Sequence, residues 1–208
     1  MKTGHIFIVR HGQTAWNKKR YQGWGDPPLD QTGEAQAEAL WEALKDAPVE
    51  KVFSSPSIRA IASVRPLLTR RGLPLFLSED LKELNYGLFE GKLKADHPLK
   101  VKRDNLHLPV TGGESLHDLY QRALCFTEDI GPDLAEGTSL IIVGHYWSNR
   151  IVLGAIQNHS FDDVITEPNY RPRNASIFEV QYTPQANGTI KVLSAKPRPG
   201  ETCETNPL

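Results

Sequence analysis

Short apolar runs alternate with helix-like segments along this chain, and that alternation restricts the possible folds more than any other feature. The first run, Ile6–Val9, is continuous and rich in β-branched residues, which is typical of a strand buried on both faces of a parallel sheet. Val49–Ser54, Leu73–Leu77 and Ser139–Val143 are predicted to be further strands. Strands that alternate with helices predict an α/β fold, with a mostly parallel central sheet flanked by helices on both faces.

Segments between these strands are predicted to be helices. Ser54-Ser55-Pro56 indicates one helix N-terminus, because serine caps helices and proline fits the first turn. Pro66 is expected to kink this helix or to end it early. The predicted helices are Gln31–Ala47, Ser55 to about Leu68, Glu114–Ile130 and His145–Ile156. The predicted buried face of the first helix consists of Ala35, Ala39, Leu40, Ala43 and Leu44.

The remaining segments are predicted to be loops and a closing pair of strands. Residues 84–113 have no clear periodicity and several glycines and prolines, which predicts a small loop-rich cap insertion. Ala175–Tyr182 and Thr189–Ala195 flank the turn signal Asn187-Gly188 and are predicted to be strands. Residues 196–208 are expected to form a loose tail. We therefore expect a single domain over residues 1–208.

Composition and charge exclude several classes of protein. The formal net charge of -1 and the pI of about 6.7 argue against a nucleic-acid partner, so any attraction to an anion must be local. Two cysteines, Cys125 and Cys203, do not suffice for a disulfide scaffold or a zinc knuckle. The apolar run before Arg10 is too short for a signal peptide or a membrane span, so a cytoplasmic location without a membrane partner is expected. A homodimer is neither required nor excluded.

Two arginines and two histidines are predicted to gather where strands end. Arg10 and His11 follow the first strand, Arg59 comes shortly after the second, and His145 follows a later one. Ligands of such sheets bind at these carboxyl ends. Arginine supplies paired donors to phosphate, a histidine can accept a phosphoryl group, and a second histidine, if cationic, can neutralise the transition state. The set predicts phosphoryl transfer in which positive side chains replace a metal ion.

Six short motifs follow one another in a fixed order between residue 6 and about residue 180. They are Ile8–Asn17 continuing into Gln22–Asp30, Ser54–Ala60, Glu83–Gly91, Gly112–Ser115, Val143–His145 and Asn174–Ile177. A lone Arg-His-Gly is a weak signal, but the ordered series is specific. The chain therefore resembles the histidine phosphatase superfamily, also called the phosphoglycerate mutase-like family.

The resemblance implies a role for each matched residue. His11 is similar to the family's phosphorylated nucleophile, and Glu83 to the general acid that protonates the leaving oxygen. A carboxyl group beside a phosphate is also expected to have a raised pKa, which suits that role. The phosphate pocket would comprise Arg10, Arg59 and His145, and the supporting substrate contacts Asn17, Gln22 and Gly23. No cofactor and no metal ion are implied, and the expected partner is a small phosphorylated metabolite.

The resemblance leaves the phosphoryl acceptor open. The interval between Gly91 and Gly112 is about 20 residues, shorter than in the family's glycolytic mutases, which favours a metal-independent phosphatase. A phosphoglycerate mutase-type phosphomutase is the alternative. A non-catalytic phospho-ligand binding module is a second alternative, against which the intact set of arginines, histidines and Glu83 argues.

Two features depart from the family pattern or extend it. Tyr146 and Trp147 stand where small residues usually follow the second histidine, so they either narrow the pocket or point away from it. A basic stretch in the cap is either a solvated surface or a rim that attracts a second anionic group, as on a bisphosphate or a phosphorylated carboxylic acid. It comprises Lys92, Lys94, Lys100, Lys102 and Arg103.

Overall fold

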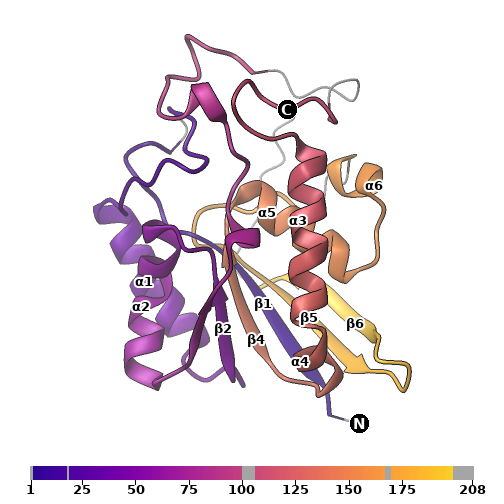
Figure 1. Cartoon of the computed structure of the whole chain (residues 1–208). Helices are drawn as coiled ribbons and strands as arrows, with labels where there is room; N and C mark the ends of the chain where they lie inside the picture. Colours follow the sequence, from indigo (N-terminus) through magenta and orange to yellow (C-terminus); the bar gives the residue numbers. More distant parts are fainter. Residues whose placement is uncertain (1, 18, 100–105, 167–169, 199–208) are drawn as a thin grey trace.

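A computed structural model describes residues 2–17, 19–99, 106–166 and 170–198 of the chain. Its centre is one six-stranded sheet with the strand order β3-β2-β4-β1-β5-β6 (Figure 1). The strands are β1 Gly4–Arg10, β2 Lys51–Ser54, β3 Leu75–Leu77, β4 Leu140–Gly144, β5 Ile177–Pro184 and β6 Ile190–Pro197. All six predicted strands are therefore present, with ends displaced by a few residues.

The sheet is mostly parallel, as predicted. β1, β4, β2 and β3 pair in parallel, whereas β5 is antiparallel to β1 and β6 to β5. The register pairs Arg10 with Gly144 and Ser54 with Val143. The carboxyl ends of β1, β2 and β4 therefore lie side by side at one edge of the sheet.

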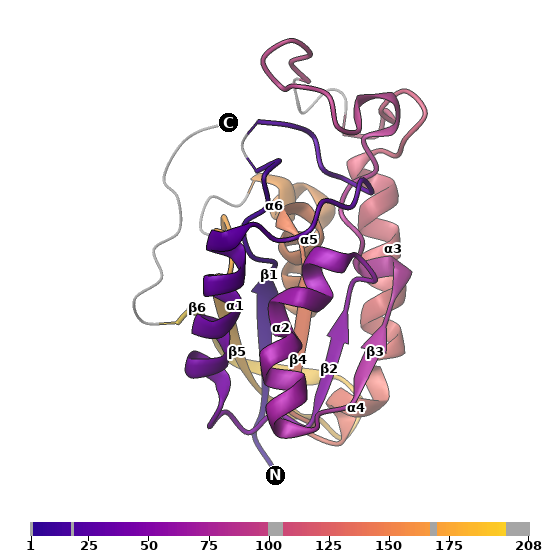
Figure 2. The ribbon, with the colours of Figure 1, turned by 90° about the vertical axis from the view of Figure 1, so that its left-hand side faces the viewer.

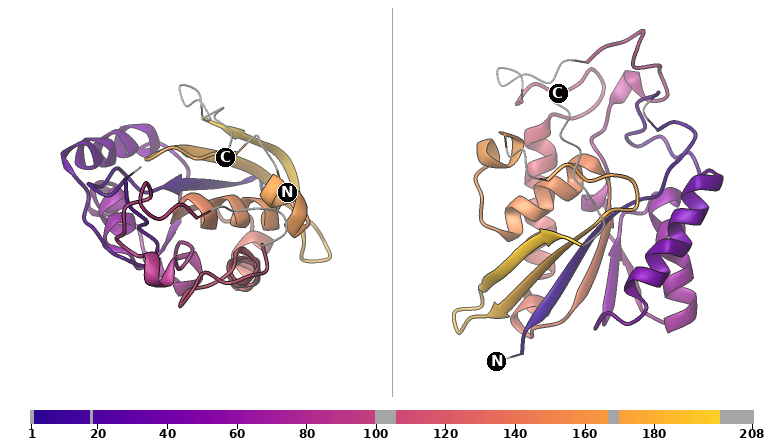
Figure 3. Two further views of the ribbon diagram at one scale, coloured as in Figure 1. Left: turned by 90° about the horizontal axis from the view of Figure 1, so that it is seen from above. Right: turned by 180° about the vertical axis from the view of Figure 1, so that it is seen from behind.

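Helices cover both faces of the sheet, again as predicted. Figures 2 and 3 show α1 (Gln31–Leu44) and α2 (Ile58–Arg71) on one face, and α3 (Leu116–Asp129) and α5 (Tyr146–Ile156) on the other. The strands supply both cores, since successive side chains point to opposite faces. Phe7 and Val9 pack with α1 and α2, and Ile6 and Ile8 with α3 and α5.

Four shorter helical segments were not predicted. They are α4 Gly131–Ala135, α6 Phe161–Thr166 and the 3₁₀ turns η1 Glu79–Leu81 and η2 Gly87–Phe89. Each is too short to display the helical periodicity on which the predictions depend. No helix in the described ranges combines the length and apolarity needed to cross a membrane.

Three sequence-based boundaries were wrong. The N-cap of α2 is Ser57, after the predicted Ser54-Ser55-Pro56, and the helix passes through Pro66 to end at Gly72 with a φ of 63°. This left-handed φ suits glycine, which has no Cβ to clash. β6 extends to Pro197, so the segment predicted to be a tail begins as paired strand, and residues 199–208 lie outside the described residues.

The predicted cap is largely irregular, with η2 as its only helical turn among the residues described between positions 84 and 113. It lies beside the loop that follows β1, at the top of Figure 1. Isolated bridges join Arg20 to Leu93 and Tyr21 to Glu90. The cap and this loop therefore form one layer above the carboxyl ends of the strands.

Candidate active site

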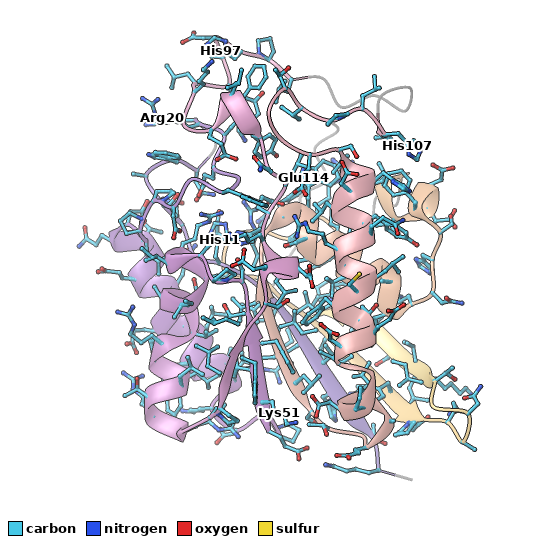
Figure 4. All side chains as sticks on the ribbon, viewed as in Figure 1. His11, Arg20, Lys51, His97, His107 and Glu114 are labelled. Atoms are coloured by element: carbon cyan, nitrogen blue, oxygen red, sulfur yellow. The ribbon has the colours of Figure 1, made fainter. Side chains whose placement is uncertain are left out.

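His11 lies at the carboxyl end of β1, below the cap that carries His97 (Figure 4). Its backbone N–H donates to the carbonyl of Gly144 at the end of β4. The imidazole is only 3% exposed, and its Nδ1 lies 2.7 Å from the carbonyl oxygen of Gly12. A carbonyl oxygen only accepts, so Nδ1 must carry the proton. The lone pair of the ring is therefore on Nε2.

Burial lowers the pKa of His11 well below its ordinary value, and the charges of Arg59 and Arg10 lower it further. The hydrogen bond to Gly12 opposes this shift. The imidazole is therefore neutral at neutral pH. A neutral imidazole with a fixed tautomer can act as a nucleophile through Nε2.

Arg59 projects from the first turn of α2 and is completely buried. Its Nη2 donates to the carbonyl of Gly23 at 2.7 Å and to His145 Nδ1 at 3.1 Å. Its Nη1 donates to the carbonyl of Gly25 at 2.7 Å, and Asp26 lies 3.4 Å away. Its Nε is buried with no hydrogen-bond partner in the described part of the chain. The guanidinium group is thus fixed, and this donor remains for an anion.

His145 is the N-cap residue of α5 and is also completely buried. Its ring lies 5.1 Å from the ring of His11, centre to centre. Because Nδ1 accepts from Arg59, the proton must be on Nε2, which lies 2.9 Å from Ser55 Oγ. Burial, followed by Arg59 and His11, lowers the pKa of His145 well below its ordinary value. The cationic form considered from the sequence is therefore not the form in this structure.

Arg10, the last residue of β1, also contributes its side chain to the site. Its Nη1 donates to the carbonyl of Pro172 at 2.7 Å, and its guanidinium group lies over the ring of Tyr146, 5.5 Å from the centre. The charge of Arg10 affects the pKa of His11, His145 and Glu83. It therefore lies within electrostatic reach of the whole group.

Glu83 follows η1 and is 7% exposed. Its carboxylate accepts from the backbone N–H of Tyr146 at 2.9 Å and of Trp147 at 3.1 Å, at the N-terminus of α5. A third backbone donor is Leu84, at 2.9 Å. Burial nevertheless raises the pKa of Glu83 above its ordinary value, against the opposing hydrogen bonds from Leu84 and Trp147 and the charges of two arginines, Arg10 and Arg59. The five residues predicted to be catalytic are therefore brought together.

The three predicted substrate contacts lie in the supporting layer of the site. Asn17 Oδ1 accepts from the N–H of Thr14 at 2.8 Å, and Gln22 Oε1 accepts from the Thr14 hydroxyl at 2.9 Å. Gly23 holds Arg59 through its carbonyl group. These bonds fix the loop after His11, while direct contact of Asn17, Gln22 or Gly23 with substrate stays a prediction.

Two residues that support the site, Asn174 and Ala175, were given no role from the sequence. Asn174 Nδ2 donates to the carbonyls of His11 and Gly12 at 3.0 and 3.2 Å. Ala175, with a φ of 58°, donates its N–H to the carbonyls of Arg10 and His11. Both residues belong to the motif Asn174–Ile177, so the signal was present although no role was assigned. A non-glycine residue in this conformation is strained and is often found at functional sites.

The predicted basic rim is described only in part. Lys92 and Lys94 lie over the rings of Phe89 and Tyr21. Desolvation and the charge of Arg10 lower the pKa of Lys94, which Glu83 opposes. Both lysines are exposed, and their attraction of a second anionic group stays a prediction. The other predicted members, Lys100, Lys102 and Arg103, lie outside the described residues.

Comparisons with known proteins show the family of the chain. The profile of the histidine phosphatase superfamily (branch 1) matches residues 6–194. A 2,3-bisphosphoglycerate-dependent phosphoglycerate mutase of Cytophaga hutchinsonii is 34% identical over 171 residues, which cover 76% of this chain and 80% of the mutase.

Solved structures share the fold over most of the chain. Bacillus stearothermophilus YhfR superposes with a TM-score of 0.75 at 27% identity, covering 91% of this chain and 95% of YhfR. A mycobacterial glucosyl-3-phosphoglycerate phosphatase superposes with a TM-score of 0.76 at 22% identity, covering 92% of this chain and 98% of the phosphatase.

Proposed function

This chain belongs to the histidine phosphatase superfamily (branch 1), and from that premise we propose that it hydrolyses small phosphomonoesters through a phosphohistidine at His11. The observation that carries the proposal is the 2.7 Å contact between His11 Nδ1 and the Gly12 carbonyl. That contact leaves Nε2 unprotonated beside Arg59 and His145. The three groups supply a nucleophile and its electrophilic surroundings.

In the first step, His11 Nε2 attacks phosphorus and the bond from phosphorus to the leaving oxygen breaks. Arg10 and Arg59 hold the non-bridging oxygens, and their charges stabilise the transition state. His145 donates its Nε2–H either to Ser55 Oγ, as in this structure, or to a phosphate oxygen. A bound phosphate dianion would raise the pKa of His145, since a nearby opposite charge favours the cationic form.

Glu83 supplies the proton that the leaving oxygen needs. Its raised pKa favours the protonated carboxyl group required at this step. In the second step a water molecule attacks the phosphohistidine, Glu83 accepts a proton from that water, and inorganic phosphate leaves. Each cycle returns Glu83 and His11 to their starting protonation states.

Transfer to a second substrate oxygen, instead of water, is the second candidate function. The 34% identity to a phosphoglycerate mutase favours it, whereas the short interval between Gly91 and Gly112 supports hydrolysis by analogy with the family. Both candidates use the same first step at His11. They differ in the product, which an assay can distinguish.

The test is to incubate the purified protein, in EDTA, with a panel of phosphomonoesters that includes 3-phosphoglycerate. We expect the wild type to release inorganic phosphate. The release should be lost in His11→Ala and retained in His159→Ala. The second variant is a matched control, because His159 lies beyond the C-terminal end of α5, away from the site. Rapid quenching in alkaline SDS, with a substrate labelled on its phosphate, should also trap the label on His11 of the wild type, because phosphohistidine is stable to base and labile to acid.

Each other outcome supports a different function. Conversion of 3-phosphoglycerate to 2-phosphoglycerate without phosphate release would establish the mutase. Binding of phosphate with no turnover of any substrate would favour the non-catalytic module. Turnover that persists in His11→Ala would show that the nucleophile has been misassigned.

A further inference from the structure

We propose that Tyr146 is a positioning residue, whose aromatic ring holds Arg10 in the orientation that binds phosphate. The inference rests on the proposed function, because it assigns Arg10 to the phosphate pocket. Tyr146 is the position at which this chain carries a bulky residue where the family it resembles usually has a small one. The structure shows what the additional bulk contacts.

The guanidinium groups of two arginines lie over the ring of Tyr146. The guanidinium carbon of Arg10 is 5.5 Å from the ring centre, and that of Arg150 is 5.7 Å from it. A guanidinium group within about 6 Å of an aromatic ring is attracted by the negative face of the ring. Arg10 also donates Nη1 to the carbonyl of Pro172, so the ring acts together with a hydrogen bond to hold the guanidinium group.

The side chain of Tyr146 is itself held in place by two neighbours. Arg150 is 4% exposed, and its Nη1 lies 3.3 Å from the Tyr146 hydroxyl. Its Nη2 donates to the carbonyls of Val164 and Ile165 at the end of α6, which anchors the arginine. Trp147 packs edge-on against Tyr146 and is buried in the core, so it points away from the pocket. Of the two bulky residues, Trp147 is a buried member of the core cluster, whereas Tyr146 is partly buried and packs against that cluster.

The backbone and the side chain of Tyr146 act on different groups. The backbone N–H donates to Glu83 Oε2, whereas the ring contacts Arg10. Any substitution other than proline keeps the N–H and its bond to the proposed general acid. A variant of the side chain therefore removes the contacts of the ring, that with Arg10 among them, while it keeps the bond to Glu83.

The experiment compares Tyr146→Leu, Tyr146→Met and Tyr146→Phe with the wild type. Calorimetry measures binding of orthovanadate, and steady-state kinetics gives kcat and KM for p-nitrophenyl phosphate. Leu and Met remove the aromatic face, and Met supplies the measurement if the Leu variant fails to fold. Tyr120→Leu is the matched control, because Tyr120 is a partly buried tyrosine on α3 whose hydroxyl bonds to a backbone carbonyl, that of His159.

We expect Leu and Met to weaken vanadate binding and raise KM by about 5- to 30-fold, the size of a partly desolvated cation–π contact. The fall in kcat should be smaller than the rise in KM, because Arg10 holds the phosphate oxygens in the ground state as well as in the transition state. Phe keeps the ring and should restore affinity to within about twofold of the wild type. Tyr120→Leu should leave vanadate affinity unchanged.

Three results would overturn the role of Tyr146: wild-type affinity in Leu and Met, a Phe variant as weak as Leu, or an equal loss in Tyr120→Leu. A wild type that binds vanadate but turns over no substrate would reject the proposed function, while the variants would still decide the role of the ring. A wild type that binds no vanadate would overturn both.

Discussion

The carboxyl group of Glu83 is subject to two opposing effects. Burial raises its pKa, while hydrogen bonds from the backbone of Leu84 and Trp147 and the charges of Arg10 and Arg59 lower it. Burial prevails, so the protonated form is more accessible than in an exposed glutamate. A general acid needs this balance, because it must give up its proton in one step and regain it in the next.

Glu83→Gln should therefore affect substrates according to their leaving groups. We expect the phosphorylation rate for an alkyl phosphate to fall by about 10²- to 10⁴-fold, and that for p-nitrophenyl phosphate by less than about tenfold. p-Nitrophenolate leaves without a proton, so it does not need the acid. Rapid-quench measurement of the phosphohistidine gives both rates, with Glu79→Gln as the exposed control. An equal loss for the two substrates would mean that Glu83 does not donate this proton.

The two buried histidines predict how stability depends on pH. Their folded-state pKa values lie well below 6.5, the value expected in the unfolded chain. Between the two values the unfolded chain binds more protons, so the free energy of unfolding rises with pH in that window. The contribution is complete above about pH 6.5 and is lost as the pH falls below it. Glu83, with its raised pKa, contributes in the opposite direction.

A difference between variants isolates one histidine. Below about pH 6, the free energy of unfolding of His11→Ala should rise relative to that of the wild type. The rise should be up to about 1.4 kcal/mol for each unit by which the pH falls. Urea unfolding from pH 5 to 7.5 measures this, with His97→Ala, whose side chain is exposed, as the control. A pH-independent difference would contradict the lowered pKa of His11.

Sequence reasoning located the residues of the site better than their states. Arg10, His11, Arg59 and His145 were predicted together because strand ends and motif order place them at one edge of the sheet. The tautomer of His11 depends on one carbonyl oxygen, and the neutral form of His145 depends on burial and on Arg59, which is distant in sequence. The spacing of residues along the chain does not reveal either of these contacts. Motif order similarly gave no role to Asn174, whose amide nitrogen spans two carbonyls.

Among the elements, α3 holds the segment that carries Glu83. Arg122 on α3 forms a two-pronged ion pair with Glu114, at 2.7 and 3.1 Å, and donates to the carbonyl of Asp80 at 2.8 Å. Its Nη2 also reaches the carbonyl of Glu83 at 3.3 Å. Glu114 accepts from the backbone N–H of Asn85 at 2.8 Å. The pair thus binds the chain on both sides of Glu83.

Arg122→Met should therefore loosen Glu83 as well as destabilise the fold. We expect a loss of about 1.5–3 kcal/mol of stability, the usual range for hydrogen bonds to charged groups, and a fall in kcat of about tenfold with little change in KM. Arg122→Lys keeps the charge but not the planar fork, so it should fall between Met and the wild type. Urea unfolding and steady-state kinetics provide the two measurements. A destabilised Met variant with an unchanged kcat would restrict Arg122 to a structural role.

The buried faces of two helices show where sequence patterns fail and where they succeed. The buried face of α1 is Gly33, Ala37, Leu40 and Leu44, so the predicted Ala35, Ala39 and Ala43 were wrong. Alanine is small and scarcely restricts which face is buried, whereas the leucines were placed correctly. The face of α3, with Leu119 and Phe126, could be predicted because its apolar residues are large.

At the scale of the whole molecule, the site depends on segments that are far apart in sequence. His11 follows β1, Arg59 lies on α2, Glu83 follows η1, and His145 begins α5. The alternation of strands and helices predicted the layers, but the strand order β3-β2-β4-β1-β5-β6 is set by tertiary pairing. The ends of β1, β2 and β4 meet because this order makes the three strands neighbours. An anion bound at this edge therefore joins elements from most of the chain.

Binding of an anion should for this reason stabilise the entire fold. Orthovanadate at about 100 times its Kd adds about 2.7 kcal/mol to the free energy of unfolding if it binds the folded state alone. For a chain of this length that corresponds to a rise in Tm of about 5–10 °C. Differential scanning calorimetry with and without vanadate measures the shift.

Two arginines of α2 provide a matched pair of variants. Arg59 is buried beside His145, whereas Arg70 is on the surface, paired with Glu38. Arg59→Met should reduce the vanadate-induced shift to less than about 2 °C, because the fixed donors and their charge are lost. Arg70→Met should retain the full shift, since its pairing is exposed and lies outside the site. A full shift in Arg59→Met would place the anion elsewhere on the molecule. That result would also contradict the chemistry proposed for His11.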